Sequence, residues 1–151
     1  MTKSFNRGFT LIELLFVIAI IGILSSVVLA SLNTARAKGA DANIKSNLAN
    51  IRAQGEVLYD TNSNYDGICG NANVIAQMNS ANTASSLLTA FSAVITDPGS
   101  ATQSVCHETS TAWAANVPLK TDSANSWCVD STGASRQLTG AYLGDSEVVC
   151  P

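Results

Sequence analysis

Residues 7–24 of the chain read RGFTLIELLFVIAIIGIL, and apolar side chains continue from there to Leu32. As a helix, the stretch from Phe9 to Leu32 is about 36 Å long, which is enough to cross a bilayer. Lys3 and Arg7 are the charged residues that precede it. By the positive-inside rule, they keep the N-terminus in the cytoplasm and send the rest of the chain outward. We therefore expect one membrane-spanning segment at residues 9–32.

Glu13 is the one charged residue in this apolar stretch. A carboxylate in the bilayer core costs a few kcal/mol on insertion scales, so it normally has a partner or a function. Because no other charge lies in the segment, we expect the partner to come from elsewhere, and a new α-amino group on another copy of the chain would serve.

A cleaved signal peptide is the alternative interpretation, because Ala35-Arg36-Ala37 fits the A-x-A cleavage pattern. The apolar run is longer than the usual 7–15 residues of such a peptide and contains Glu13. Both features favour a retained segment.

The stretch Gly8-Phe9-Thr10-Leu11-Ile12-Glu13-Leu14 resembles the prepilin peptidase signal of type IV pilins and type II secretion pseudopilins. The resemblance implies cleavage between Gly8 and Phe9 and N-methylation of Phe9. It also implies that Glu13 is an assembly determinant, paired with the N-terminal ammonium of a neighbouring subunit. It covers about the first 30 residues of the chain.

One feature departs from many major pilins, which carry a helix-kinking proline in the second half of this segment. No proline lies between Phe9 and Pro98.

A stripe of small residues lies roughly opposite Glu13 on the helical wheel, and small residues let helices approach closely in a membrane. We expect this stripe to contact a second neighbour in an assembly, with Gly22 and Ser26 as its central residues; its members are Ala19, Gly22, Ser26 and Ala30.

The helix is expected to continue to about Tyr59, because no turn signal interrupts it. Its second half carries an amphipathic stripe that reaches from Ala37 to Leu58. Gly55 lies in this stripe, where close approach to a sheet would explain a glycine. We divide the chain into a leader (1–8), a membrane and filament-core helix (9–32), an amphipathic continuation (33–60) and a globular head (61–151).

The head is expected to contain one or two short helices between Asn73 and Val94, followed by short strands. The strands are predicted at residues 104–108, 111–119, 126–130 and 135–138. They suit an antiparallel sheet with one face packed on the stripe of the long helix. The fold class is therefore α+β and pilin-like, with Trp113 and Trp127 as core residues.

Four cysteines follow the apolar segment, and none forms a C-x-x-C pair. An even number beyond a membrane-targeting segment indicates two disulfides in an oxidising compartment. The pairing that best suits the layout is Cys69–Cys106 and Cys128–Cys150, one of three possible pairings. The second would be similar to the C-terminal disulfide loop of many pilins.

The chain carries no recognisable catalytic motif, so we expect a structural protein without a cofactor and not an enzyme. His107 is the single histidine and is expected to be an ordinary surface or strand residue. Asp122, Asp130 and Asp145 are weak calcium candidates, suggested by the calcium site of the major pseudopilin. A net charge of −3 with no basic cluster argues against bulk nucleic-acid binding.

Together these features predict a prepilin that is cleaved, methylated and polymerised into a type IV pilus-like filament. Its expected partners are other copies of itself, the prepilin peptidase and the assembly machinery of the inner membrane; the finished filament would be extracellular or periplasmic. One alternative is a pseudopilin of a type II secretion system. The others are a membrane-anchored binding domain that never polymerises and a DNA-uptake pilin, for which Arg136 is thin support.

Overall fold

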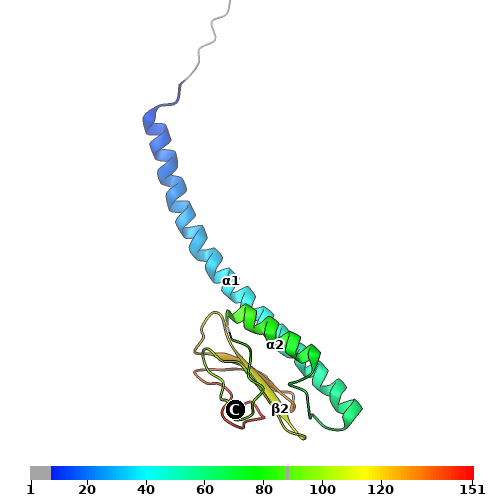
Figure 1. Cartoon of the computed structure of the whole chain (residues 1–151). Coiled ribbons are helices and arrows are strands. Elements are labelled where there is room, and N and C mark those ends of the chain that lie inside the picture. Colours follow the sequence, from blue (N-terminus) through cyan, green and yellow to red (C-terminus); the bar gives the residue numbers. More distant parts are fainter. Residues whose placement is uncertain (1–7, 88) are drawn as a thin grey trace, which may run out of the picture. The chain divides into compact units, whose positions relative to one another are not determined.

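The computed structural model describes residues 8–87 and 89–151, which form two compact units. The first unit ends at Arg36 and the second runs from Ala37 to Pro151. Helix α1 (Leu11–Asn62) passes through both (Figure 1). It starts two residues later than the expected Phe9 and ends three residues after Tyr59. The leader residues 1–7, with Lys3 and Arg7, lie outside the described residues.

In the second unit, α1 buries the stripe that its sequence predicts. Ile44, Leu48 and Ile51 are fully buried. Helix α2 (Ala72–Ser85) runs antiparallel beside it, because Asn73 hydrogen-bonds Gln54 at 3.1 Å while Asn47 hydrogen-bonds Ser80 at 3.2 Å.

Helix α2 is capped at both ends, which fixes its length. The Asn71 side chain accepts a hydrogen bond from the Asn73 N–H at 2.9 Å, and Ser86 adopts a left-handed conformation at φ 66°. Of the one or two short helices expected between Asn73 and Val94, one is therefore present, and it ends at Ser85. The segment that follows carries an isolated bridge between Ser92 and Val105.

Four antiparallel strands form one sheet in the order β1-β2-β3-β4. The strands are β1 (Val105–Glu108), β2 (Trp113–Pro118), β3 (Ser126–Asp130) and β4 (Ser135–Leu138). They match the four predicted strands, with ends shifted by at most two residues. The α+β, pilin-like fold class is confirmed: a long apolar N-terminal helix followed by a small antiparallel sheet.

Both faces of the sheet are covered at strands β1 to β3, whereas three of the four residues of the edge strand β4 are exposed. One face packs against α1 and α2 through Trp113, Ala115 and Val117. The other is covered by the C-terminal segment, where Leu143 and Cys150 pack on Val105, Ala114 and Cys128. Figure 1 shows the helices and the C-terminal segment on opposite sides of the strands. The sequence predicted the first contact and not the second.

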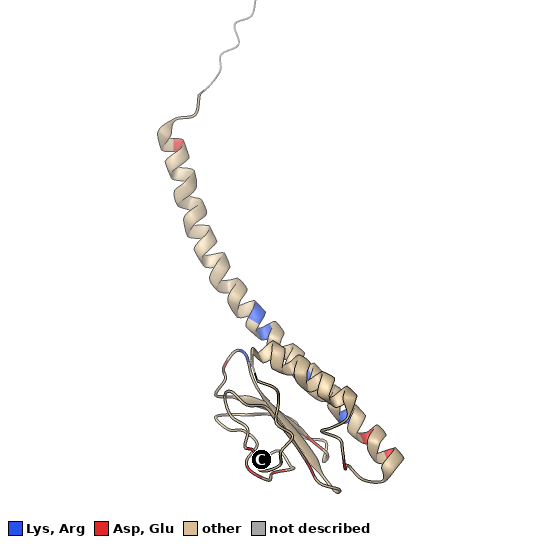
Figure 2. Ribbon diagram, viewed as in Figure 1, with Lys and Arg blue, Asp and Glu red and all other residues tan. Residues whose placement is uncertain are grey.

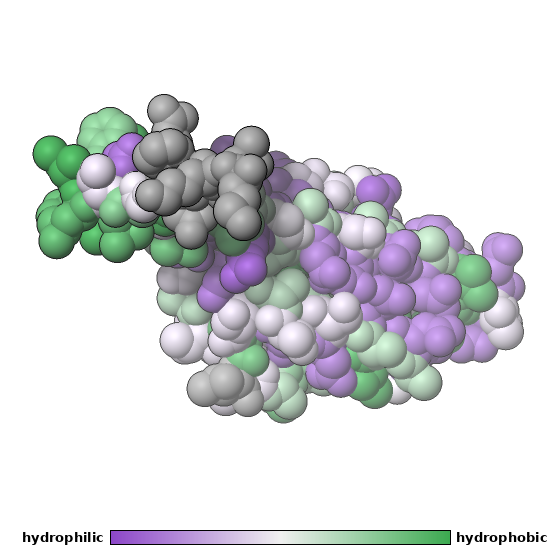
Figure 3. Space-filling model, turned by 90° about the horizontal axis from the view of Figure 1, so that it is seen from above, coloured by the Kyte–Doolittle hydropathy of each residue, from purple (hydrophilic) through white to green (hydrophobic). Residues whose placement is uncertain are grey.

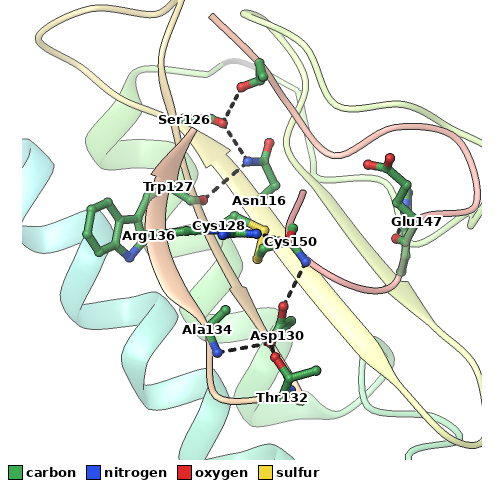
Figure 4. Close-up of a disulfide and its surroundings, with 12 residues drawn as sticks. Asn116, Ser126, Trp127, Cys128, Asp130, Thr132, Ala134, Arg136, Glu147 and Cys150 are labelled. Carbon is green, nitrogen blue, oxygen red and sulfur yellow. Dashed lines mark hydrogen bonds between the residues drawn. A yellow bond between two sulfur atoms is a disulfide. The ribbon is translucent and has the colours of Figure 1, made fainter. Parts of the chain in front are cut away.

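A disulfide lies on each side of the sheet. Cys69–Cys106 joins the connection between the helices to β1, and Cys128–Cys150 joins β3 to the C-terminal segment. These are the two pairs favoured from the layout of the sequence. Figure 4 shows the second pair beside Arg136, whose guanidinium donates to the Cys150 carbonyl.

Gly55 lies where α1 meets the sheet. A Cβ atom at this position would be 2.9 Å from Nε1 of Trp113 and 3.0 Å from Cδ1 of Ile68. The close approach to the sheet that a glycine in the stripe predicted is therefore present.

Candidate processing and assembly site

Thr10 and Glu13 form a reciprocal cap at the start of α1. The Glu13 carboxylate accepts hydrogen bonds from the Thr10 N–H at 2.9 Å and from its hydroxyl at 2.7 Å. The Thr10 hydroxyl oxygen in turn accepts from the Glu13 N–H at 3.3 Å. This is a capping box, in which a threonine at the N-cap and a glutamate three residues later satisfy backbone donors that a helix start leaves unpaired.

The cap places the peptide bond between Gly8 and Phe9 outside the helix. Residues 8–10 are not helical and are exposed, and α1 starts at Leu11. A protease binds its substrate in an extended form more readily than as a helix, because helical backbone groups are already bonded to each other. The bond that the resemblance marks for cleavage is therefore accessible.

The expectation that the partner of Glu13 must come from elsewhere is incomplete. Thr10 supplies two donors from the same chain. Both donors are neutral, however, so they satisfy hydrogen bonds without balancing the charge. A charge in a bilayer or a filament core still requires a cation.

The apolar segment is not covered by any residue that the structure describes. Phe9, Leu11 and Ile12 are each at least 75% exposed, and no residue between Leu11 and Leu32 is buried. Among the described residues, α1 is the one helix long and apolar enough to cross a membrane. Figure 3 shows this surface in green. An exposed apolar surface of this size needs lipid or other protein around it.

Gly22 and Ser26 lie in uninterrupted helix. A Cβ at Gly22 would meet nothing within 4 Å, and the Ser26 hydroxyl donates to the Ile23 carbonyl at 2.8 Å. The space beside them is therefore open to a neighbouring helix, and their contact with a second subunit stays a prediction.

The three calcium candidates are not brought together. Asp122 accepts hydrogen bonds from Ala124 and Asn125, and Asp145 from Ser146. Asp130 is buried and accepts from Thr132, Ala134 and Cys150 (Figure 4). Within residues 8–87 and 89–151, no group of three His, Cys, Asp or Glu side chains is arranged to hold a metal ion.

His107 is a strand residue, as one of the two expectations had it, but it does not lie on the surface. Its side chain is fully buried. Nδ1 lies 2.9 Å from the Glu147 carbonyl oxygen and Nε2 lies 2.9 Å from that of Asp97. The ring therefore connects two loops on the side of the sheet that the C-terminal segment covers.

Two residues with clear roles were missed from the sequence. One is Thr10, although the pattern Thr-x-x-Glu before an apolar run is a readable cap signal. The other is Asp41, a buried acid on α1 that accepts hydrogen bonds from the Lys120 N–H at 2.6 Å and from the Thr121 hydroxyl. No local pattern reveals Asp41, because its partners lie about 80 residues away in the connection between β2 and β3.

Comparison with family models identifies the N-terminal segment. The chain carries a prokaryotic N-terminal methylation motif, which matches residues 3–29. This motif is the hallmark of type IV pilins and pseudopilins. No curated protein and no solved structure matches the chain.

The motif supports a prepilin of the type IV pilin or pseudopilin kind, and that family consists of structural subunits. Such a motif implies processing by a prepilin peptidase. The exposed apolar helix fits a membrane-anchored pilin.

Proposed function

We propose that this prepilin is a structural subunit that is cleaved between Gly8 and Phe9, methylated at Phe9 and polymerised into a type IV pilus-like filament. The observation that carries the proposal is the coincidence of the methylation motif with an apolar helix that none of the described residues covers. Before assembly the membrane surrounds that helix, and in a filament other copies of it would.

Cleavage supplies the cation that Glu13 lacks. Hydrolysis of the Gly8–Phe9 bond creates an α-amino group on Phe9, four residues before Glu13. In an apolar surrounding an unpaired carboxylate is costly, and a neighbouring ammonium offsets much of that cost. Pairing between copies therefore links assembly to processing, because an uncleaved chain has no such group at Phe9.

The type II secretion pseudopilin is the other member of the same family that fits the motif. A pilin and a pseudopilin would use the same cleavage, methylation and Glu13 contact. The proposal therefore holds for either kind of filament. The location of the filament separates them, since a pilus extends from the cell and a pseudopilus stays in the periplasm.

Replacement of Glu13 by Val tests polymerisation. In the native cells, we expect wild-type chains to yield filaments on shearing and Glu13→Val chains to be cleaved normally but to yield almost none. Asp145→Val is a matched control, since Asp145 is an exposed acid outside the apolar segment. Wild-type yield of filaments from Glu13→Val would refute the assembly role, and absence of filaments from wild-type cells would favour a non-polymerising anchored domain.

A further inference from the structure

His107 is buried between two turns on the side of the sheet that the C-terminal segment covers. It lies on β1, its side chain is fully buried, and it is the single histidine of the chain. In the first turn, the Asp97 N–H donates to the Val94 carbonyl at 3.0 Å. In the second, the Gly144 N–H donates to the Glu147 carboxylate at 2.6 Å. We call these the 94–97 turn and the 144–147 turn.

Both ring nitrogens of His107 face acceptors. Nδ1 lies 2.9 Å from the Glu147 carbonyl oxygen, and Nε2 lies 2.9 Å from the Asp97 carbonyl oxygen. A neutral imidazole has one N–H and one lone pair, so in either tautomer one of these oxygens would face a lone pair at 2.9 Å. The imidazolium has two N–H groups and satisfies both carbonyls. The geometry therefore favours the charged ring.

The charges of the two turns also favour a cation at this position. The turns contain the acids Asp97, Asp145 and Glu147 and no Lys or Arg. Asp97 and Asp145 are exposed, so solvent and salt screen their charges, whereas Glu147 is half-buried. Most of the bases that the structure describes lie on α1 instead (Figure 2).

The sheet adds another acid on the same face. His107 on β1 and Asp130 on β3 both pair with Ala114 of β2, so they are two strand spacings apart, about 9.6 Å. Burial acts to raise the pKa of Asp130, but its hydrogen bonds outweigh burial, so the carboxylate is ionised at neutral pH. A negative charge at this distance in a buried face favours the imidazolium.

Two other charged residues of the sheet have less influence on His107. Glu108 is paired with Trp113 on the helix side of the sheet, where its carboxylate accepts from the N–H groups of Gly67 and Cys69. Arg136 lies on β4, three strand spacings from β1, or about 14 Å. The charge around His107 on its own face is therefore mainly negative.

We propose that His107 is an imidazolium in the folded head and is a pH-sensitive clamp between the 94–97 turn and the 144–147 turn. At a pH high enough to remove one ring proton to solvent, one carbonyl loses its donor and faces a lone pair. The clamp therefore stabilises the closed turns at low pH, and this stabilisation is lost as the pH rises.

The expected response is local. The Ser146 N–H donates to the Ile95 carbonyl at 2.7 Å, which joins the two turns directly, so this bond should open more often once the ring is neutral. The Cys128–Cys150 disulfide still holds the end of the chain on the sheet. Because the head is expected outside the cytoplasm, the clamp would respond to the pH on that side of the membrane.

Nitrogen NMR of the ring tests the charge. The full chain is labelled with ¹⁵N-histidine and purified in detergent micelles with its disulfides intact, and its single histidine makes the ring signals unambiguous. We expect two protonated ring nitrogens at about pH 7.5, where a histidine with the ordinary pKa of about 6.5 is mostly neutral. The reduced chain in urea is the control and should show the neutral ring. One protonated nitrogen and one lone pair in the folded head would overturn the proposal.

Amide hydrogen exchange in the same sample tests the clamp. When the pH is raised until the ring loses its proton, the protection of the Ser146 amide should fall at least about fivefold. Val117, in the central strand β2, is the internal control and should keep its protection. Unchanged protection of Ser146, or a ring that stays protonated wherever the head is folded, would overturn the pH response.

His107→Phe keeps a buried ring and removes both donors. Its Ser146 amide should be poorly protected at every pH, because neither carbonyl has a donor from the ring. The wild-type pH response in His107→Phe would show that another group causes it and would overturn the role of His107. If this variant does not fold, the two measurements on the wild-type chain decide.

Discussion

Glu13 accepts hydrogen bonds from both the backbone N–H and the hydroxyl of Thr10, at 2.9 and 2.7 Å. The same carboxylate is therefore a helix cap in its own chain and, in the proposed filament, the anion of an ion pair with another. The two roles require different chemistry, since a cap needs an acceptor oxygen and an ion pair needs a charge. Substitutions that remove one without the other separate them.

Glu13→Gln removes the charge and keeps an oxygen that can cap Thr10. We expect the helix start to be preserved and the filament yield to fall at least about tenfold, because an unmatched ammonium would remain in an apolar surrounding. Filaments can be sheared from cells and quantified by immunoblot. Wild-type yield from Glu13→Gln would mean that the carboxylate serves as a cap alone.

Thr10→Ala removes the cap and keeps the charge. Loss of a threonine N-cap costs about 1 kcal/mol. Exchange of the Glu13 amide hydrogen, which is bonded to the Thr10 hydroxyl oxygen, should accelerate about fivefold when it is measured by NMR on the full chain in micelles. Thr10→Ser keeps the hydroxyl and should exchange like wild type. Equal protection in the alanine and serine variants would contradict the cap.

Gly55→Ala should destabilise the head, because the added methyl would lie 2.9 Å from Trp113 Nε1 and 3.0 Å from Ile68 Cδ1. Overpacking of this kind costs about 1–3 kcal/mol. Gly39→Ala is the control: its Cβ would meet nothing within 4 Å, so the change should be neutral or slightly stabilising. Thermal unfolding followed by tryptophan fluorescence compares them, and equal midpoints would show that the contact carries no strain.

The ionised carboxylate of Asp130 should stabilise the head at neutral pH, and this stabilisation should be lost in acid. Burial acts to raise its pKa, but hydrogen bonds from Thr132, Cys150 and Ala134 outweigh burial and lower the pKa below the ordinary 3.8. A lowered folded-state pKa adds stability above about pH 3.8, and that stability is lost as the pH falls through the folded-state value.

Asp130→Asn should therefore be less stable than wild type at neutral pH, by about 1–3 kcal/mol, with a difference that shrinks as the pH falls below 3.8. Urea unfolding at a series of pH values measures this difference. Asp145→Asn, at an exposed acid, should follow the wild-type curve. A difference for Asp130→Asn that stays constant across the pH series would contradict the assignment.

The sequence predicted the parts of the fold that local patterns determine. Trp113 was predicted as a core residue of the sheet that packs on α1, and Gly55 indicated the close approach. The four strands were predicted with ends that differ from the observed ones by at most two residues. These features depend on neighbours two to four residues apart, so they are visible in one sequence.

Other features depend on contacts between distant segments and could not be predicted. The C-terminal segment covers the second face of the sheet, which buries His107 between the Asp97 and Glu147 carbonyls. Asp41 likewise gains its role from Thr121. At the processing site, the motif identified Gly8, Phe9 and Glu13, whereas the part that Thr10 plays as a cap follows from its hydrogen bonds with Glu13.

The most direct test of the account is mass spectrometry of the N-terminal peptide of the protein isolated from its native cells. We expect N-methylated Phe9 as the first residue. Lys38 as the first residue, the product of signal-peptide cleavage after Ala37, would contradict it, as would a chain that retains the leader in assembled filaments.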